Sequence, residues 1–313
     1  MKLEQRKDLL GLRDMSRKEI ELILDTAIPM KDVISRDIKK VPALRGKAMV
    51  TVFYENSTRT RTSFELAGKY LSADTVNLAV STSSVQKGES LRDTIKTMEV
   101  MGFDLMVIRH AMSGTPHYVA KNTKMRVINA GDGTNEHPTQ ALLDMYTIKE
   151  KKGTLENLKV AIVGDILHSR VARSNIYGLK KFGCEVRVVG PTTLMPPEIE
   201  KLGVKSYFSL EEAINGVDVI NVLRVQRERQ QSGLFPSLDE YARLYMVNTK
   251  MLSKAKDDVL ILHPGPVNRG VEISSELADS SQALINEQVS NGVAVRMALL
   301  FLMMGGARDE INN

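Results

Sequence analysis

Apolar, β-branched runs alternate with amphipathic segments along almost the whole chain, and this alternation constrains the fold more than any other feature. Strands separated by helices are typical of parallel sheets covered on both faces. In the first half the pattern predicts strands at 48–54, 74–78, 104–109 and 126–129, and helices near 58–70, 90–101 and 115–121. Before them, Ser16 and Glu19 form the capping-box pattern that opens a first helix.

A second series of the same kind follows a long predicted helix at 138–151. Its strands are predicted at 159–163, 185–189, 218–222 and 259–262, and a final helix at 284–304. No repeat or Pro/Gly/Ser-rich linker separates the two series. The sequence therefore predicts an α/β fold of two domains, each a mostly parallel sheet flanked by helices.

Length and cysteine usage agree with a cytoplasmic protein of two domains. The chain has 313 residues, a length that exceeds what one core usually supports, and 42% of these residues are hydrophobic. Residues 1–10 lack the pattern of a secretory signal, and the apolar tract 293–304 contains Arg296 and is shorter than the roughly 20 residues that span a bilayer. The one cysteine, Cys184, excludes an intrachain disulfide and is expected to be a small buried thiol at a strand entrance.

The charge pattern argues against a nucleic-acid-binding protein and is compatible with small anionic substrates. Lys and Arg number 43 against 38 Asp and Glu, a mild excess that is interspersed along the chain. A modest positive field raises the local concentration of anionic substrates. The five histidines have no Cys or carboxylate at metal-ligand spacing, so no metal site is predicted.

The strongest functional signal lies at residues 53–65, between the strand predicted at 48–54 and the helix predicted at 58–70. Ser57, Thr58, Arg59, Thr60 and Arg61 occupy this strand-to-helix turn. The N-terminus of a helix offers free backbone N–H groups to an anion, and hydroxyls and a guanidinium add further phosphate donors. Alone, Ser57 or Thr58 would be read as an ordinary helix cap with solvated arginines behind it. The full string instead predicts a phosphate site.

A dinucleotide site is the competing interpretation of the second half. Residues 160–165 form a strand that ends in Gly164 before a helical segment. The dinucleotide fingerprint needs three glycines in G-x-G-x-x-G, and only Gly164 is present. No nucleotide or other cofactor is predicted.

The string at 53–65 resembles the carbamoyl phosphate signature of the aspartate and ornithine carbamoyltransferases. The resemblance extends over essentially the whole chain, at residues 83–90, Arg109, 137–144, Gly164-Asp165, Ser169-Arg170, 224–229 and 263–270. It implies a carbamoyl phosphate-binding domain at 1–135 together with the C-terminal helix 286–313, and an aspartate-binding domain at 136–285. It also implies transfer of a carbamoyl group to an amine, the reaction of this family.

The resemblance implies a role for each matching residue. Carbamoyl phosphate is expected to contact Ser57, Thr58, Arg59, Thr60, Ser83, Lys87, Arg109, His137, Gln140, Gly265 and Pro266. The expected catalytic residues are Arg59, Thr60, Lys87, Arg109 and His137. For His137 the plainer interpretation is a core histidine, and for Lys87 a solvated loop lysine, and the surrounding motifs reverse both.

The acceptor favoured by the sequence is aspartate. Its two carboxylates need cationic partners, which Lys87, Arg170 and Arg224 would supply, and the amide of Gln226 would add a neutral donor. The Ser-Met-Gly and His-Cys-Leu-Pro segments typical of the ornithine enzymes are missing from the sequence. Residues 265–270 also depart from the His-Pro-Leu-Pro form of some aspartate enzymes, which leaves the regulatory class open.

The resemblance further implies a homotrimer in which Ser83 and Lys87 reach the active site of the adjacent subunit. Glu55, Arg170 and Arg229 are expected to pair when the domains close. A regulatory chain or a dihydroorotase partner is left open. Two alternatives remain: the same chemistry on another amine such as ornithine, and a non-catalytic scaffold subunit of this fold.

Overall fold

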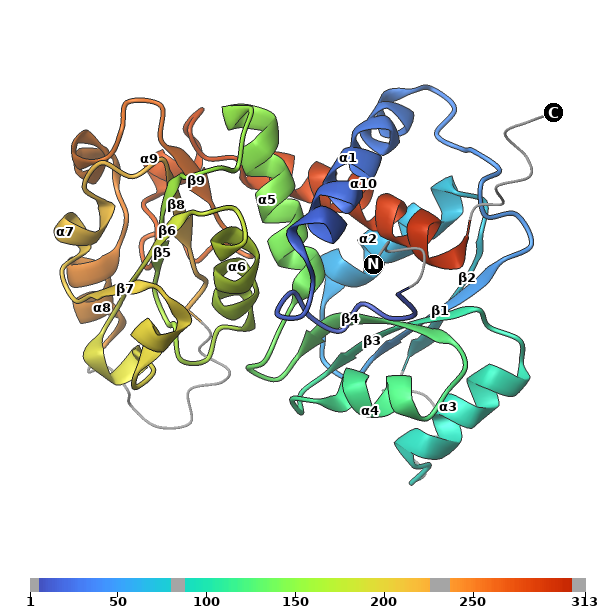
Figure 1. The fold of residues 1–313 in the computed structure, drawn as a ribbon. Helices are drawn as coiled ribbons and strands as arrows, with labels where there is room; N and C mark the ends of the chain where they lie inside the picture. The colour runs from blue at the N-terminus through green and yellow to red at the C-terminus, as the bar shows by residue number, and fades with distance from the viewer. Residues whose placement is uncertain (1–5, 80–87, 226–236, 306–313) are drawn as a thin grey trace. The chain divides into compact units, whose positions relative to one another are not determined.

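The computed structural model describes residues 6–79, 88–225 and 237–305 (Figure 1). The chain divides into two compact units: unit 1 comprises Met1–Leu143 and Val289–Asn313, and unit 2 comprises Asp144–Gln288. Two helices, α5 (Pro138–Lys152) and α10 (Ile285–Met304), each begin in one unit and end in the other.

Unit 1 contains a parallel sheet of four strands in the order β2-β1-β3-β4. The strands are β1 (Ala48–Phe53), β2 (Asp74–Ala79), β3 (Leu105–His110) and β4 (Arg126–Asp132). The chain first crosses from β1 outward to β2 and then returns to β3 on the other side of β1. The strand order therefore reverses between β1 and β3, and at such a switch point a ligand fits beyond the carboxyl ends of the strands.

Helices cover both faces of this sheet, with α3 and α4 on one face and α1 and α2 on the other (Figure 1). Their bounds are α1 (Arg17–Ser35), α2 (Thr58–Tyr70), α3 (Leu91–Val100) and α4 (Thr115–Lys121). Val50 and Val52 of β1 pack with Ile95 of α3 in a fully buried cluster. On the opposite face α2 approaches the sheet closely, because a Cβ at Gly68 would collide with Thr75 and Met49.

Unit 2 contains a parallel sheet of five strands in the order β7-β6-β5-β8-β9. The strands are β5 (Lys159–Val163), β6 (Glu185–Val189), β7 (Lys205–Tyr207), β8 (Val219–Val222) and β9 (Leu260–Leu262). The order reverses between β5 and β8, which gives this sheet its own switch point.

The helices and helical turns of unit 2 bury its strands on both faces, which is why those strands are almost continuously apolar. They are α6 (Arg170–Lys180), η4 (Thr192–Leu194), η5 (Ile199–Leu202), α7 (Leu210–Ile214), α8 (Leu238–Tyr245), η7 (Thr249–Lys254) and α9 (Ser275–Ala278). Val163, Ile220 and Ile261 form the centre of the core with Tyr241 of α8.

The structure confirms the predicted α/β class, with two units that each contain a parallel sheet. The first helix begins at the predicted capping box, where the Glu19 N–H donates to Ser16 Oγ (3.2 Å) and the Ser16 N–H to Glu19 Oε2 (2.7 Å). Strand β7 was not predicted, because it is three residues long and its first two, Lys205 and Ser206, are polar. The strand expected at 126–129 extends to Asp132.

Two further predictions can be compared with the described residues. Cys184 is buried as expected, and burial raises the pKa of its thiol to about 11, which keeps it protonated and unreactive. Among the helices of the described ranges, none has both the length and the apolar content to cross a bilayer.

Candidate active site

The switch point of unit 1 brings two predicted site segments to the same edge of the sheet. Phe53, the last residue of β1, pairs in register with Arg109 of β3. The next N–H of the chain, that of Tyr54, donates to the Arg109 carbonyl at 2.9 Å. The turn that carries residues 57–61 and the side chain of Arg109 therefore leave adjacent strands at their carboxyl ends.

The N-terminus of α2 differs from most helix starts in this protein. Ser57 is its N-cap residue, yet the Ser57 side chain makes no capping hydrogen bond, whereas Ser90 accepts the N–H of Asp93 at the start of α3. The first helical acceptor of α2, the Ser57 carbonyl, binds the N–H of Arg61 at 3.1 Å. The preceding N–H groups belong to the set that a helix cannot satisfy internally. This terminus suits an anion.

The side chains at residues 57–60 differ in their exposure to solvent. Thr58 and Arg59 are exposed, Ser57 is half-buried, and Thr60 is buried. Arg109 is 14% exposed; its Nη1 donates to the Ala130 carbonyl (3.3 Å). Hydroxyls and two guanidinium groups thus belong to one sheet edge, which fits a phosphate group better than an uncharged ligand.

Glu55 lies beside Arg109 within unit 1. Its Oε2 is 3.4 Å from Arg109 Nε, and both side chains are largely buried. This ion pair holds the guanidinium at the sheet edge. The predicted pairing of Glu55 with Arg170 and Arg229 on domain closure stays a prediction, because Arg170 belongs to unit 2 and Arg229 lies outside the described residues.

His137 ends the β4–α5 connection and Gln140 lies in the first turn of α5, and both belong to unit 1. Both are more than nine-tenths buried. The His137 carbonyl accepts the N–H groups of Gln140 (3.0 Å) and Ala141 (3.3 Å), so His137 directly precedes the first turn of α5.

A buried carboxylate that the sequence analysis missed fixes this connection. Asp132 is fully buried and accepts the N–H groups of Gly114 (2.7 Å) and Glu136 (3.2 Å) and the amide of Asn129 (2.8 Å). The available signal was the run of polar and small residues from 129 to 133 at the end of an apolar strand. Asp132 orients the backbone that leads to His137.

Arg296 of α10 contacts α2 and α5, the two helices that carry candidate site residues of unit 1. Its guanidinium lies 5.1 Å from the ring centroid of Phe64 on α2, and its Nη2 donates to Thr139 Oγ1 on α5 at 3.4 Å. Arg296 is 4% exposed. One buried cation therefore contacts the second turn of α2 and the first turn of α5.

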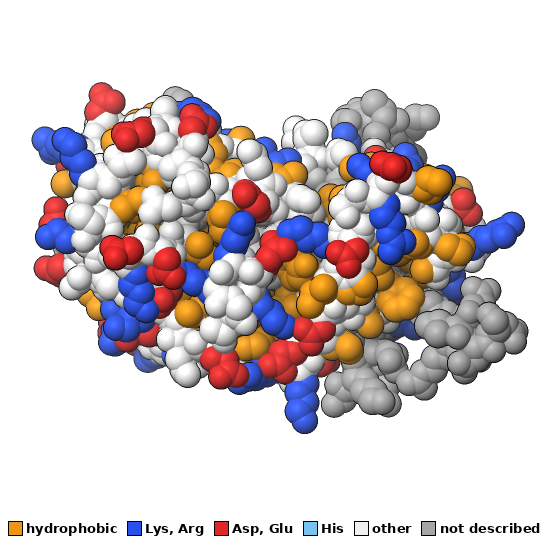
Figure 2. Space-filling view, turned by 90° about the horizontal axis from the view of Figure 1, so that it is seen from above, with side chains coloured by type: hydrophobic (Ala, Val, Ile, Leu, Met, Phe, Trp, Pro, Cys, Tyr) orange, Lys and Arg blue, Asp and Glu red, His pale blue; other side chains and the backbone are white. Residues whose placement is uncertain are grey.

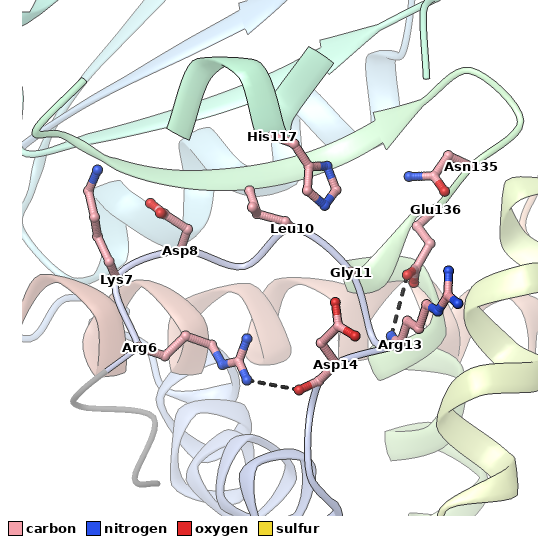
Figure 3. A pocket seen from close by; sticks show the side chains of 10 residues that line it. All are labelled: Arg6, Lys7, Asp8, Leu10, Gly11, Arg13, Asp14, His117, Asn135 and Glu136. Carbon is pink, nitrogen blue, oxygen red and sulfur yellow. Dashed lines mark hydrogen bonds between the residues drawn. The ribbon is translucent and has the colours of Figure 1, made fainter. Parts of the chain in front are cut away.

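A cavity of about 400 Å³ lies next to the β4–α5 connection, and none of the predicted site residues lines it (Figure 3). It is lined by Arg6, Lys7, Asp8, Leu10, Gly11, Arg13, Asp14, His117, Asn135 and Glu136. Glu136 accepts the N–H of Leu12 (2.7 Å) and of Arg13 (3.4 Å). A Cβ at Gly11 would collide with that carboxylate. The N-terminal segment therefore packs against the β4–α5 connection.

The switch point of unit 2 carries two of the predicted aspartate ligands. Val163 at the end of β5 pairs with Val222 at the end of β8. Arg170 is the first residue of α6, after β5, and Arg224 follows β8 by two residues. Arg170 is 2% exposed and Arg224 is half-buried. Here Ser169 does cap its helix, since its Oγ accepts the Ala172 N–H at 3.1 Å.

Gly265 and Pro266 follow β9 in the same unit. Gly265 has φ +61°, a conformation that L side chains rarely adopt, which accounts for glycine at this position. Its N–H donates to His263 Nδ1 at 2.8 Å.

Four predicted site residues, Ser83, Lys87, Gln226 and Arg229, lie outside the described residues. Within the ranges that the structure describes, no group of three or more His, Cys, Asp or Glu side chains is arranged to hold a metal ion.

Sequence comparison identifies the class of protein. The profile described as aspartate/ornithine carbamoyltransferase, carbamoyl-P binding domain, matches residues 7–150, and that described as Asp/Orn binding domain matches residues 156–303. The chain belongs to the aspartate/ornithine carbamoyltransferase family.

Individual relatives within this family can also be compared with the chain. The chain is 87% identical, over 99% of both chains, to a protein of Syntrophomonas wolfei named aspartate carbamoyltransferase catalytic subunit. It is similar in structure to the aspartate transcarbamoylase of Trypanosoma cruzi in complex with carbamoyl phosphate and aspartate, with a TM-score of 0.84, 29% identity and 94% coverage of both chains. The ornithine carbamoyltransferase of Pyrococcus furiosus aligns with a TM-score of 0.84, 30% identity and 96% and 98% coverage.

Proposed function

We propose that this chain is an enzyme that transfers the carbamoyl group of carbamoyl phosphate to the α-amino group of L-aspartate. The products are N-carbamoyl-L-aspartate and phosphate, which places the reaction in pyrimidine biosynthesis. The observation that carries the proposal is the uncapped N-terminus of α2 at the switch point of unit 1, beside Arg109. The relative at 87% identity carries the name of this activity.

The phosphate is held by the turn at residues 57–60 and by Arg109. Backbone N–H groups at the start of α2, the hydroxyls and the guanidinium groups supply donors for its oxygens. Ser83 and Lys87 add further donors. Since these groups are in place before the bond breaks, they stabilise negative charge on the departing phosphate without reorganisation.

The α-amino nitrogen attacks the carbonyl carbon of carbamoyl phosphate. A C–N bond forms, the C–O bond to phosphate breaks, the phosphate leaves with that electron pair, and the amine loses a proton. Thr60, Arg109 and His137 donate to the carbonyl oxygen as its charge grows, and Gln140 accepts from the carbamoyl nitrogen. No covalent intermediate with the protein is needed.

Aspartate is recognised through its carboxylates by Arg170, Arg224, Gln226 and Lys87. The backbone oxygens of Pro264 or Gly265 and of Pro266 orient the amine. Carbamoyl phosphate binding is assigned to residues 1–135 with 286–313, and aspartate binding to residues 136–285. When the two domains close, Glu55 pairs with Arg170 and Arg229. The assignment of the aspartate contacts is supported by chemistry, because two carboxylates need guanidinium or ammonium partners.

The assembly is a cytoplasmic homotrimer with shared active sites. Lysine, arginine and carboxylate side chains are intermixed on the face seen in Figure 2, which is unlike the single-sign surface of a nucleic-acid-binding protein. A regulatory chain or a dihydroorotase is a possible further partner.

The deciding assay measures product formation by the purified chain with carbamoyl phosphate and either aspartate or ornithine. We expect N-carbamoyl-L-aspartate with aspartate and no citrulline with ornithine. A reaction without an acceptor controls for spontaneous decomposition of carbamoyl phosphate. Citrulline formation would instead support the ornithine reaction, and no transfer to either amine would support the scaffold.

Shared sites are tested by mixing subunits. Lys87→Gln and Arg59→Ala variants are each expected to be nearly inactive, whereas co-refolded hybrids contain some sites with both residues intact and regain activity. Verified subunit exchange without any recovered activity would overturn the shared site.

A further inference from the structure

Glu272 is a fully buried carboxylate to which the sequence analysis gave no role. Its Oε1 accepts the N–H of Asn268 at 2.6 Å and lies 3.1 Å from His263 Nε2, and its Oε2 accepts the Asn268 side-chain amide at 3.1 Å. A buried carboxylate is costly unless such donors satisfy it. Glu272 therefore fixes two neighbouring segments of unit 2.

The first segment is the Gly265–Pro266 turn, which Glu272 reaches through His263. The Gly265 N–H donates to His263 Nδ1 at 2.8 Å, so Nδ1 must be unprotonated. The ring proton then lies on Nε2 and is donated to Glu272. The His263 side chain is fully buried, so this one tautomer connects the carboxylate to the backbone of the turn.

The second segment is the backbone beside Arg224, which Glu272 reaches through Asn268. The Asn268 side-chain amide donates both to Glu272 Oε2 and to the Val225 carbonyl at 3.2 Å. Val225 directly follows Arg224 and is itself buried. One carboxylate thus holds the end of β8 and the turn after β9 in a fixed relation.

We propose that Glu272 is a positioning residue for the acceptor substrate, acting through His263 on the Gly265–Pro266 turn and through Asn268 on the Val225 carbonyl, next to Arg224. This inference rests on the proposed function, in which that turn orients the amine and Arg224 binds a carboxylate. Displacing either segment weakens aspartate use more than carbamoyl phosphate binding, because most of the expected carbamoyl phosphate contacts belong to unit 1.

Two substitutions of His263 separate positioning from simple stabilisation. In His263→Asn the side-chain oxygen can still accept the Gly265 N–H, but Glu272 loses one donor. In His263→Gln the amide can still donate to Glu272, but the Gly265 N–H loses its acceptor. Since an unsatisfied buried group costs about 1–3 kcal/mol and 1.4 kcal/mol is tenfold, we expect His263→Gln to raise the aspartate KM about tenfold or more.

The His263→Asn variant cuts the same connection at its Glu272 end, so it is expected to raise the aspartate KM to a similar extent. It is also expected to unfold at a lower temperature than His263→Gln, because it leaves the buried Glu272 less satisfied. The two variants would then share a raised KM although their stabilities differ. A normal aspartate KM in folded His263→Asn, or a KM that follows stability, would overturn the proposal.

Glu272→Gln tests the second connection. The new amide would face the Asn268 amide, and turning Asn268 to relieve this would remove the donor from Val225. We expect kcat/KM for aspartate to fall about tenfold, while the Kd for carbamoyl phosphate measured by calorimetry stays constant. Asp279→Asn is the matched control, since it breaks the exposed pair with Arg269 (2.6 Å) on the same segment without touching Glu272.

Unchanged aspartate kinetics in folded Glu272→Gln, or an equal loss in the Asp279→Asn control, would overturn the inference. Should Glu272→Gln fail to fold, the two His263 variants decide. A wild-type enzyme inactive with aspartate would overturn the proposed function instead, so the two failures are distinguishable.

Discussion

The two switch points of this protein differ in how the helix that follows each of them begins. In unit 1 the helix after the first strand of the pair starts without a side-chain cap, and Arg59 in its first turn is exposed. In unit 2 the corresponding helix is capped by Ser169, and Arg170 in its first turn is buried. The backbone N–H groups at the start of α2 have no side-chain cap, whereas at the start of α6 the Ala172 N–H donates to Ser169.

The difference matches the chemistry of the two proposed substrates. A phosphate has several charged oxygens around one centre and can be surrounded by N–H groups at a helix terminus. Two separated carboxylates are better recognised by guanidinium groups held at defined positions. The two proposed anion sites would then depend on backbone donors at one switch point and on side chains at the other.

The largest expected effect comes from the exposed guanidinium of unit 1. Arg59→Ala should lower kcat at least about a hundredfold, the scale of losing one preset oxyanion donor. Steady-state kinetics with both substrates measures this. Lys69→Ala, at the exposed end of the same helix, is the control and should keep normal turnover. Near-normal turnover in Arg59→Ala would remove the phosphate site from this terminus.

In unit 2 the comparable change is Arg224→Ala. We expect the aspartate KM to rise about 10- to 100-fold, because hydrogen bonds to charged groups contribute about 1.5–3 kcal/mol. The Kd for carbamoyl phosphate, measured by calorimetry, should not change. Arg243→Ala, an exposed arginine of α8, serves as the control. Loss of carbamoyl phosphate affinity in Arg224→Ala would contradict the division of labour between the units.

A matched pair of serine substitutions isolates the role of the caps. Ser169→Ala should lower the free energy of unfolding by about 1 kcal/mol, because it removes a cap. Ser57→Ala should leave stability nearly unchanged and weaken carbamoyl phosphate binding. Urea unfolding and calorimetry distinguish the two. Equal destabilisation by both substitutions would show that α2 is capped in solution and would argue against a free terminus.

The smallest expected effect is a pH dependence at the end of β3. Burial lowers the pKa of His110 below its ordinary value of 6.5, although the charges of Glu55 and Asp132 oppose this shift. Below pH 6.5 the unfolded chain therefore binds more protons than the folded chain, and stability falls as the pH falls.

His110→Asn should reduce this loss, because an amide does not titrate in this range. Its oxygen can still accept the Met112 N–H, which donates to His110 Nδ1 at 2.9 Å in the wild-type protein. Urea midpoints from about pH 5.5 to about pH 7.5 measure the difference. Parallel slopes for the two proteins over this range would exclude His110 as the group responsible.

Local patterns predicted much of the fold, since strand and helix periods depend on neighbouring residues. The capping box at Ser16 and the burial of Cys184 are confirmed, as is the α/β class. Strand β7 was missed, because three residues give no usable period. The role of Asp132 was missed as well, because a carboxylate after a strand is not distinguishable from a loop residue until its donors are known.

By itself, the sequence determined the alternation of strands and helices, the residue types at the turn from 57 to 61, and the family resemblance. Only the tertiary structure decided that Phe53 pairs with Arg109, that Val163 pairs with Val222, and that Glu272 joins the backbone beside Arg224 to the turn after β9. The physical reason is separation along the chain. Asn268 and the Val225 carbonyl are 43 residues apart, and no local period encodes a contact that forms only when the strands between them have packed into a sheet.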